Sequence, residues 1–155
     1  MDDLDREILH ALQHDGRQTN ASLAETIGLS PSATLERVRR LERDGAIRGY
    51  RAVVAPEALG LAVQALIGVR LRLHNQDSIA QFEQRVGEVG SIVSCTHVTG
   101  QFDYILRVAV RDLAHLRETL RVELAAIPGV AKFETMLALS EIKADTGWPA
   151  GDQPA

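Results

Sequence analysis

The chain has 155 residues, of which 45% are hydrophobic and 25% charged. These values are close to the averages for globular proteins, so they exclude a wholly disordered chain, a collagen-like repeat and a coiled coil. The single cysteine, Cys95, excludes an intramolecular disulfide and any multi-cysteine metal site, and it fits a reducing compartment. No apolar stretch approaches the ~18 residues that span a bilayer, and the first residues are acidic where a signal peptide is basic. We therefore expect a cytoplasmic protein without a membrane partner.

The arginines are concentrated in one part of the chain. The formal net charge is −4, yet six arginines and only two acidic residues fall between Arg37 and Arg51. A protein that coats nucleic acid without preference is basic overall, so a basic patch within an acidic chain indicates one confined site for an anion.

The first 45 residues predict three helices. Asp3–His14 has apolar residues at helical spacing, and acidic residues in its first turn, where the helix dipole favours them. A short second helix follows, with Asn20 as its N-cap and Gly28 as the residue that stops it. Two short helices joined by a few residues around a glycine, with a first helix to pack against, indicate a helix-turn-helix.

The third helix is the second of that pair. Ser30 is its expected N-cap, Pro31 occupies the first helical position, and Asp44 with Gly45 closes it. Its expected inward stripe consists of Leu35, Val38 and Leu41. The opposite face, rich in arginine and small polar residues, then points to solvent.

After Gly45 the hydrophobic period changes from helical to alternating. Ala46–Val54 predicts a short strand pair or wing. Further on, a helix is expected from Asp77, and a longer one, capped by Asp112, ends at Pro128. Strands are expected at Val63–Leu73, Ile92–Thr99, Tyr104–Val110 and Val130–Ile142. The fold class is therefore α+β: an N-terminal winged helix-turn-helix followed by a ferredoxin-like βαββαβ domain.

This pattern gives four segments. We expect a DNA-binding domain at residues 1–54, a linker at 55–62, a ferredoxin-like oligomerisation domain at 63–144, and a loose tail at 145–155. A lone βαββαβ sheet leaves one face without helices, so we expect at least a homodimer.

Several motifs together resemble the Lrp/AsnC family of transcription regulators. They are LDREIL at 4–9, LAETIGLS at 23–30, SPSATLERVRRLERDGAI at 30–47 and THVTGQFDYIL at 96–106. The resemblance implies a double-stranded DNA partner and a C-terminal domain, residues 63–144, that binds an effector and dimerises through its sheet. It also implies assembly of the dimers into larger rings such as an octamer, and an amino-acid effector bound near the VTGQFDY turn.

Arginine suits bidentate contact with guanine, and small residues at a helix start allow close approach to bases or phosphate. Alternatively, Glu36 and Arg40 form only an i,i+4 ion pair on a solvated surface. The helix-turn-helix context favours the first interpretation. The candidate DNA-binding residues are Asn20, Ser30, Ser32, Ala33, Glu36, Arg37 and Arg40.

The turn around Gly100 is either a simple hairpin or an effector loop whose backbone amides hold a carboxylate. Gln101 stands where the family often has an acid, which puts an α-ammonium partner in doubt. Thr135 and Leu137 match positions that often line the pocket from a neighbouring subunit. The candidate effector residues are Thr99, Gly100, Gln101, Asp103, Tyr104, Thr135 and Leu137.

No catalytic or metal-binding constellation is evident, and no cofactor is expected. Three hypotheses follow: a sequence-specific regulator tuned by a small molecule such as an amino acid, an architectural DNA-compacting protein without an effector, and an enzyme on a dimeric ferredoxin-like sheet. Site preference on DNA separates the first two, and turnover of any substrate separates the third.

Overall fold

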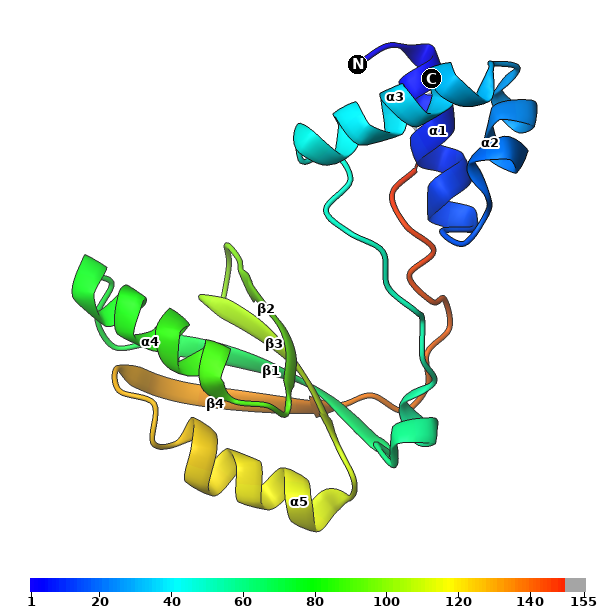
Figure 1. The fold of residues 1–155 in the computed structure, drawn as a ribbon. Coiled ribbons are helices and arrows are strands. Elements are labelled where there is room, and N and C mark those ends of the chain that lie inside the picture. Colours follow the sequence, from blue (N-terminus) through cyan, green and yellow to red (C-terminus); the bar gives the residue numbers. More distant parts are fainter. Residues whose placement is uncertain (150–155) are drawn as a thin grey trace. The chain divides into compact units, whose positions relative to one another are not determined.

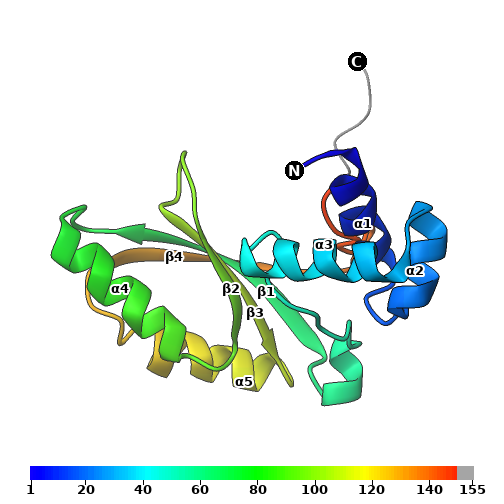
Figure 2. The ribbon, with the colours of Figure 1, turned by 45° about the horizontal axis from the view of Figure 1, so that its top comes forward.

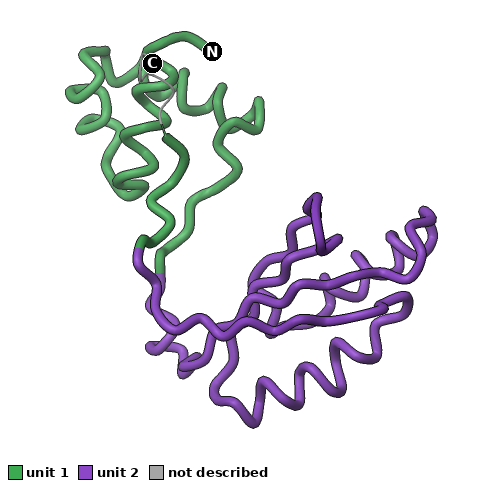
Figure 3. Tube along the Cα trace, turned by 180° about the vertical axis from the view of Figure 1, so that it is seen from behind, with its two compact units in different colours: residues 1–53, 143–155 green, residues 54–142 purple. Residues whose placement is uncertain are grey.

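The computed structural model describes residues 1–149, which fall into two units (Figure 3). Unit 1 consists of Met1–Val53 and the C-terminal segment from Lys143. Unit 2 is Val54–Ile142. Among the described residues, no helix is long and apolar enough to cross a membrane.

Three helices form the body of unit 1: α1 (Asp3–His14), α2 (Asn20–Ile27) and α3 (Pro31–Arg43), as Figure 1 shows. Their apolar faces meet in a small core of Ile8, Leu23, Ile27 and Leu41. Gly28 ends α2 in the left-handed conformation, with φ of 72°, which a residue with a side chain rarely adopts. This turn brings α3 directly after α2, in the helix-turn-helix order that the sequence predicts.

The cap of α2 differs from the prediction. Thr19, not Asn20, is the N-cap, and its hydroxyl accepts from the backbone N–H of Ser22 at 3.1 Å. Asn20 instead donates through Nδ2 to the carbonyl of Pro31 at 2.7 Å. Asn20 therefore ties the start of α2 to the start of α3.

The inward stripe of α3 is also shifted. Thr34 is fully buried, whereas Leu35 is 38% exposed. Thr34 can be buried because its hydroxyl donates to the carbonyl of Ser30 at 3.1 Å, which satisfies its polar group. The stripe is thus Thr34, Val38 and Leu41, and the outward face is rotated accordingly.

The predicted wing is absent. Residues 46–54 form no strand, and Val53 is 90% exposed. The alternating pattern there has no neighbouring strand in unit 1 to pair with, so the backbone has no ladder to join.

Unit 2 is a four-stranded antiparallel sheet in the order β2-β3-β1-β4. Both main helices cover the same face of the sheet (Figure 2). Its strands are β1 (Val63–Leu71), β2 (Ile92–His97), β3 (Tyr104–Val110) and β4 (Val130–Leu137). The helical segments are η1 (Pro56–Leu59), α4 (Gln76–Glu88), α5 (Leu113–Glu118) and a π-helical continuation, η2 (Thr119–Leu124).

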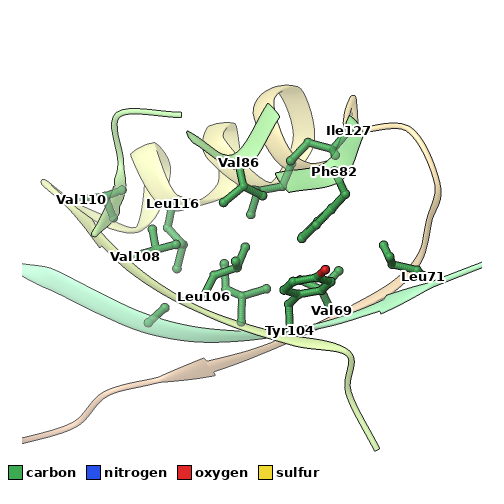
Figure 4. Close-up of a cluster of buried hydrophobic side chains, with 13 residues drawn as sticks. Val69, Leu71, Phe82, Val86, Tyr104, Leu106, Val108, Val110, Leu116 and Ile127 are labelled. Atoms are coloured by element: carbon green, nitrogen blue, oxygen red, sulfur yellow. The ribbon is translucent and has the colours of Figure 1, made fainter. Parts of the chain in front are cut away.

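The main core lies between this sheet face and the helices. Alternate residues of β1 and β3 are buried there, because successive side chains of a strand point to opposite faces. They meet Phe82 and Val86 of α4 and Leu116 of α5 (Figure 4). The predicted βαββαβ order is confirmed, although β1, β2 and β4 end earlier than expected.

Among residues 1–149, no helix covers the opposite face of the sheet, and the apolar side chains there are partly covered by one aromatic ring. Leu66 is 42% and Met136 40% exposed. Phe102, from the turn between β2 and β3, packs on Gly68 of β1, and a Cβ at Gly68 would lie 2.7 Å from the ring. Gly68 therefore makes room for the turn to fold back over the sheet.

The described part of the C-terminal segment is hydrogen-bonded to α1. The side-chain amide of Gln13 on α1 accepts from the backbone N–H of Trp148 at 2.6 Å and donates to the Trp148 carbonyl at 3.2 Å. The rest of the predicted tail, residues 150–155, lies outside the described residues.

We expect Gln13→Ala to release this segment, because the substitution removes both hydrogen bonds. Trp148 is the only tryptophan of the chain, so its fluorescence anisotropy reports on the segment directly. The anisotropy should fall in Gln13→Ala and stay unchanged in Gln81→Ala, which alters an exposed glutamine of α4. An unchanged value in Gln13→Ala would show that the contact does not hold the segment.

Candidate functional site

The outward face of α3 presents a stripe of polar side chains at helical spacing. Ser32, Glu36, Arg39 and Arg43 are all exposed, and positions three or four apart lie on one side of a helix. Within residues 1–149, the side chains of Glu36, Arg39 and Arg43 make no hydrogen bond or ion pair in unit 1 or elsewhere. Their donors and acceptors are free for a partner molecule.

Arg37 and Arg40 lie on a different side of α3, against the start of α1. Nη1 of Arg37 donates to Asp2 Oδ2 at 2.8 Å and to Asp5 Oδ1 at 2.8 Å. Nη2 of Arg40 donates to both oxygens of Asp5, at 2.7 and 2.8 Å. The side chain of Asp5 is 2% exposed, against 24% for Arg37 and 45% for Arg40. The structure thus groups two arginines around one buried carboxylate.

The two aspartates also form the cap of α1. The Asp2 side chain accepts from the backbone N–H of Asp5 at 2.9 Å, and the Asp5 side chain accepts from the backbone N–H of Asp2 at 3.1 Å. This reciprocal pairing is a capping box, here with aspartate at both positions. One pair of residues therefore both starts α1 and binds the arginines of α3.

These contacts keep both carboxyl groups ionised. The hydrogen bond from Arg37 is the largest cause that lowers the pKa of Asp2, to about 2. Burial acts to raise the pKa of Asp5, but the backbone N–H of Asp2, the Arg37 hydrogen bond and the charge of Arg40 outweigh it, so that pKa is lowered as well.

A pH dependence follows from these shifts. A carboxyl group with a lowered pKa in the folded state stabilises the fold above its unfolded pKa, and that stabilisation is lost as the pH falls through the folded value. We expect unit 1 to lose stability between about pH 4 and about pH 2, the range bounded by the ordinary and the lowered pKa of Asp2. Thermal unfolding followed by Trp148 fluorescence should show this slope, and Arg37→Gln should flatten it. An equally steep slope in Arg37→Gln would contradict the assignment.

The remaining candidates for DNA contact lie near the start of α3. Ser30 caps this helix by accepting from the backbone N–H of Ala33 at 3.3 Å. Ser30 and Ser32 place their hydroxyls 3.2 Å apart, and both residues are exposed. Ala33 is half-buried. Arg39 and Arg43 are not among the seven candidates, although the helical wheel of the sequence places Arg43 on the outward face and Arg39 at its edge.

The turn between β2 and β3 leaves its tip open. Thr99, Gly100 and Gln101 are exposed. Gly100 has φ of 116°, and no atom lies within 4 Å of the Cβ position, so the tip has both an unusual backbone and free space. These three residues are therefore accessible from solvent.

Asp103 and Tyr104 are occupied within the chain. Asp103 accepts from the backbone N–H of Leu71 at 2.7 Å through Oδ2, and its Oδ1 lies 2.9 Å from Nε2 of His74. The Leu71 N–H is the largest cause that lowers the pKa of Asp103. Tyr104 is 1% exposed, and its hydroxyl donates to Glu83 at 2.8 Å. Both residues hold the turn in place, and their polar groups are already hydrogen-bonded within the chain.

Thr135 and Leu137 are separated from the turn in one chain. They lie on β4, paired with Ile67 and Ala65 of β1, whereas the turn joins β2 and β3 on the other side of β1. A single subunit therefore does not bring all seven candidates together. Within residues 1–149, no group of three or more His, Cys, Asp or Glu is arranged to hold a metal ion.

Comparisons with known proteins also indicate a helix-turn-helix domain followed by a ligand-binding domain. Residues 1–42 match the AsnC-type helix-turn-helix domain and residues 64–148 match the Lrp/AsnC ligand binding domain. The leucine-responsive regulatory proteins of Escherichia coli and Klebsiella pneumoniae are each 39% identical over 143 residues, which covers 92% of this chain and 87% of theirs.

Solved structures show the same similarity along the chain. A transcriptional regulator from Neisseria meningitidis in complex with L-Met has a TM-score of 0.91 and 34% identity, covering 97% of both chains. An AsnC family transcriptional regulator from Agrobacterium tumefaciens has a TM-score of 0.89 and 32% identity, covering 96% of this chain and 97% of that one.

Proposed function

The chain belongs to the Lrp/AsnC family of transcription regulators, and we propose that it recognises specific DNA sites through α3 while an amino acid modulates its binding or assembly. The observation that carries the proposal is the outward stripe of α3, in which Glu36, Arg39 and Arg43 have no partner among the described residues. In a helix-turn-helix, the second helix enters the major groove. A DNA partner supports a cytoplasmic location for the protein.

The proposal is tested by selection of binding sites from random DNA, with and without each common amino acid. We expect one enriched motif, arranged as two half-sites related by a pseudo-twofold axis and spaced by about one turn, ~34 Å, or a multiple of it. Absence of any enriched motif would contradict sequence-specific recognition.

The amino-acid effector is proposed for the turn at Thr99–Gln101. The similar regulator that is in complex with L-Met supports an amino acid as the ligand class, and exposed backbone amides at a turn can hold its carboxylate. Asp103 is already bound to Leu71 and His74, and Gln101 is neutral, so neither offers a free negative charge to the α-ammonium group.

We expect Gln101→Glu to tighten binding of an amino acid by about tenfold, because it supplies that charge. Calorimetric titration of wild type and variant with the common amino acids measures the effect, and Gln84→Glu on α4 serves as the charge-matched control. Tight binding by the wild type that Gln101→Glu weakens would show that the amide itself is a specific donor.

We also propose that the protein is a homodimer that assembles further, with an octamer as one such assembly. The helix-free face of the sheet supports this, since Leu66 and Met136 remain 42% and 40% exposed on it. A neighbouring subunit is then the source of Thr135 and Leu137 for the effector pocket. Sedimentation that shows only monomer at micromolar concentration would contradict the dimer.

A second candidate function is architectural DNA binding without an effector, which Gln101 favours. Salt-dependent binding to every duplex without site preference would support it. We infer regulation and not catalysis, because the family is one of transcription regulators.

A further inference from the structure

The cluster of Asp2, Asp5, Arg37 and Arg40 has a feature that helix capping alone does not require. Capping needs only exposed or half-exposed carboxylates, but Asp5 is 2% exposed on its side chain. Desolvating a carboxylate is costly unless it is paired and hydrogen-bonded. All of its contacts are made: Oδ1 accepts from Arg37 and Arg40, and Oδ2 accepts from Arg40 and from the backbone N–H of Asp2.

In contrast, only some of the hydrogen-bond donors of the two arginines have a partner. An arginine side chain has five N–H donors, and here Arg37 donates only through Nη1 and Arg40 only through Nη2. The other donors have no partner within the described residues. Arg40 is also 45% exposed, so its free edge can reach a molecule bound against α3.

The position of Arg37 and Arg40, held by Asp5, suits contact with DNA phosphates better than contact with bases. Arg37 and Arg40 lie toward α1, to one side of the stripe formed by Ser32, Glu36, Arg39 and Arg43. In helix-turn-helix proteins the second helix lies in the major groove, and the elements beside it cross the sugar-phosphate backbone. A guanidinium held by a carboxylate keeps its orientation, so less side-chain freedom is lost when it binds an anion.

We propose that Asp5 is a positioning residue for DNA binding: its buried carboxylate holds Arg37 and Arg40 as a fixed pair of phosphate donors beside the base-recognition stripe. The inference rests on the proposed function of α3 and divides its arginines into two classes. Arg40 and Arg37 contact the backbone of any duplex, and Arg39 distinguishes one sequence from another.

The alternative role of the aspartates, competition with DNA for the arginines, predicts the opposite effect on DNA affinity. If Asp2 and Asp5 merely compete with DNA for the arginines, removing the Asp5 charge frees them and tightens binding. If Asp5 positions them, Asp5→Asn weakens binding even though the variant carries one negative charge fewer.

The test measures affinity for a selected duplex and for a scrambled duplex of the same composition over a range of salt concentrations. We expect Arg40→Gln to weaken binding to both duplexes by the same factor, about tenfold, and to lower the salt slope by about one. We expect Arg39→Gln to weaken binding to the selected duplex by about 10- to 100-fold more than to the scrambled one. Arg39 is the matched control, because it is exposed and unpaired.

Asp5→Asn should behave like Arg40→Gln, with equal weakening on both duplexes. The double variant Asp5→Asn/Arg40→Gln should be no weaker than Asp5→Asn alone, because the two residues act as one unit. Asp3→Asn removes the same charge on the same helix, at a side chain that is 87% exposed and pairs with Arg6 and not with the arginines of α3, and it should bind as wild type or slightly tighter. Helical circular dichroism verifies the fold of each variant.

If Asp5→Asn does not fold, Asp5→Glu replaces it, because it keeps the charge and shifts the oxygens by one methylene. Equal or tighter binding by a folded Asp5 variant would overturn the inference, as would a sequence-dependent loss in Arg40→Gln. A failure of the proposed function can be distinguished from a failure of this inference. If α3 does not recognise a sequence, the wild type binds both duplexes equally, and the loss of affinity in Asp5→Asn can still be measured on both.

Discussion

Ile8→Ala is expected to unfold unit 1 and abolish DNA binding. Ile8 is fully buried in a small core with Leu23, Ile27 and Leu41. Truncating a buried isoleucine to alanine costs about 2–5 kcal/mol. A unit of this size has a stability of only a few kcal/mol at roughly 0.05–0.15 kcal/mol per residue, so the substitution removes most of it.

The measurement is thermal unfolding followed separately in the two units. Trp148 fluorescence reports on unit 1, and the sheet signal in circular dichroism reports on unit 2. We expect the first transition to move down by many degrees and the second to stay in place. Ile8→Val, which costs about 0.5–1.5 kcal/mol, is the graded control. Retained DNA binding in Ile8→Ala at 37 °C would contradict the role of this core.

Gly68→Ala is expected to abolish the amino-acid response while leaving DNA binding without ligand intact. The new Cβ would lie 2.7 Å from the Phe102 ring, a distance that the well-packed ring cannot tolerate. Overpacking of this kind costs about 1–3 kcal/mol. Phe102 must move, and with it the turn that carries Gly100 and Gln101.

Calorimetric titration with amino acids and DNA-binding measurements on the same variant test this separation. Gly87→Ala on α4 is the matched control, because no atom lies within 4 Å of the Cβ position there. It should bind both partners as wild type does. An unchanged amino-acid affinity in Gly68→Ala would show that the turn does not depend on Phe102.

The fold could be predicted from local patterns because they are strong in this chain. Capping residues, glycine stops and the switch from helical to alternating periodicity define the three helices and the βαββαβ order. The prediction of a wing was wrong because an alternating pattern shows only that a segment could form a strand. In the structure, Ala46–Val54 has no partner strand to pair with. The hydrogen bonds between Gln13 and Trp148 could not be predicted because the two residues are 135 positions apart, beyond the reach of any local pattern.

The site was less predictable because it depends on contacts across elements. Thr34 can be buried because its hydroxyl donates to the Ser30 carbonyl, whereas Leu35 is 38% exposed, so the polarity of the two side chains does not tell which of them faces the core. The role of Asp5 was hidden for a similar reason, since a first-turn aspartate is ordinarily explained by the helix dipole. The D-x-x-D spacing of Asp2 and Asp5 was the one available signal, and it indicates a cap, not an ion cluster.

The most direct test of the account is the affinity ratio of the wild-type protein for a selected duplex and a scrambled one, at one stated salt concentration. Specific regulators typically bind their sites about 10³- to 10⁷-fold more tightly than other DNA. We predict a ratio of at least about 10³, lowered by Arg39→Gln. A ratio near one, with binding that depends only on salt, would contradict sequence-specific recognition by α3.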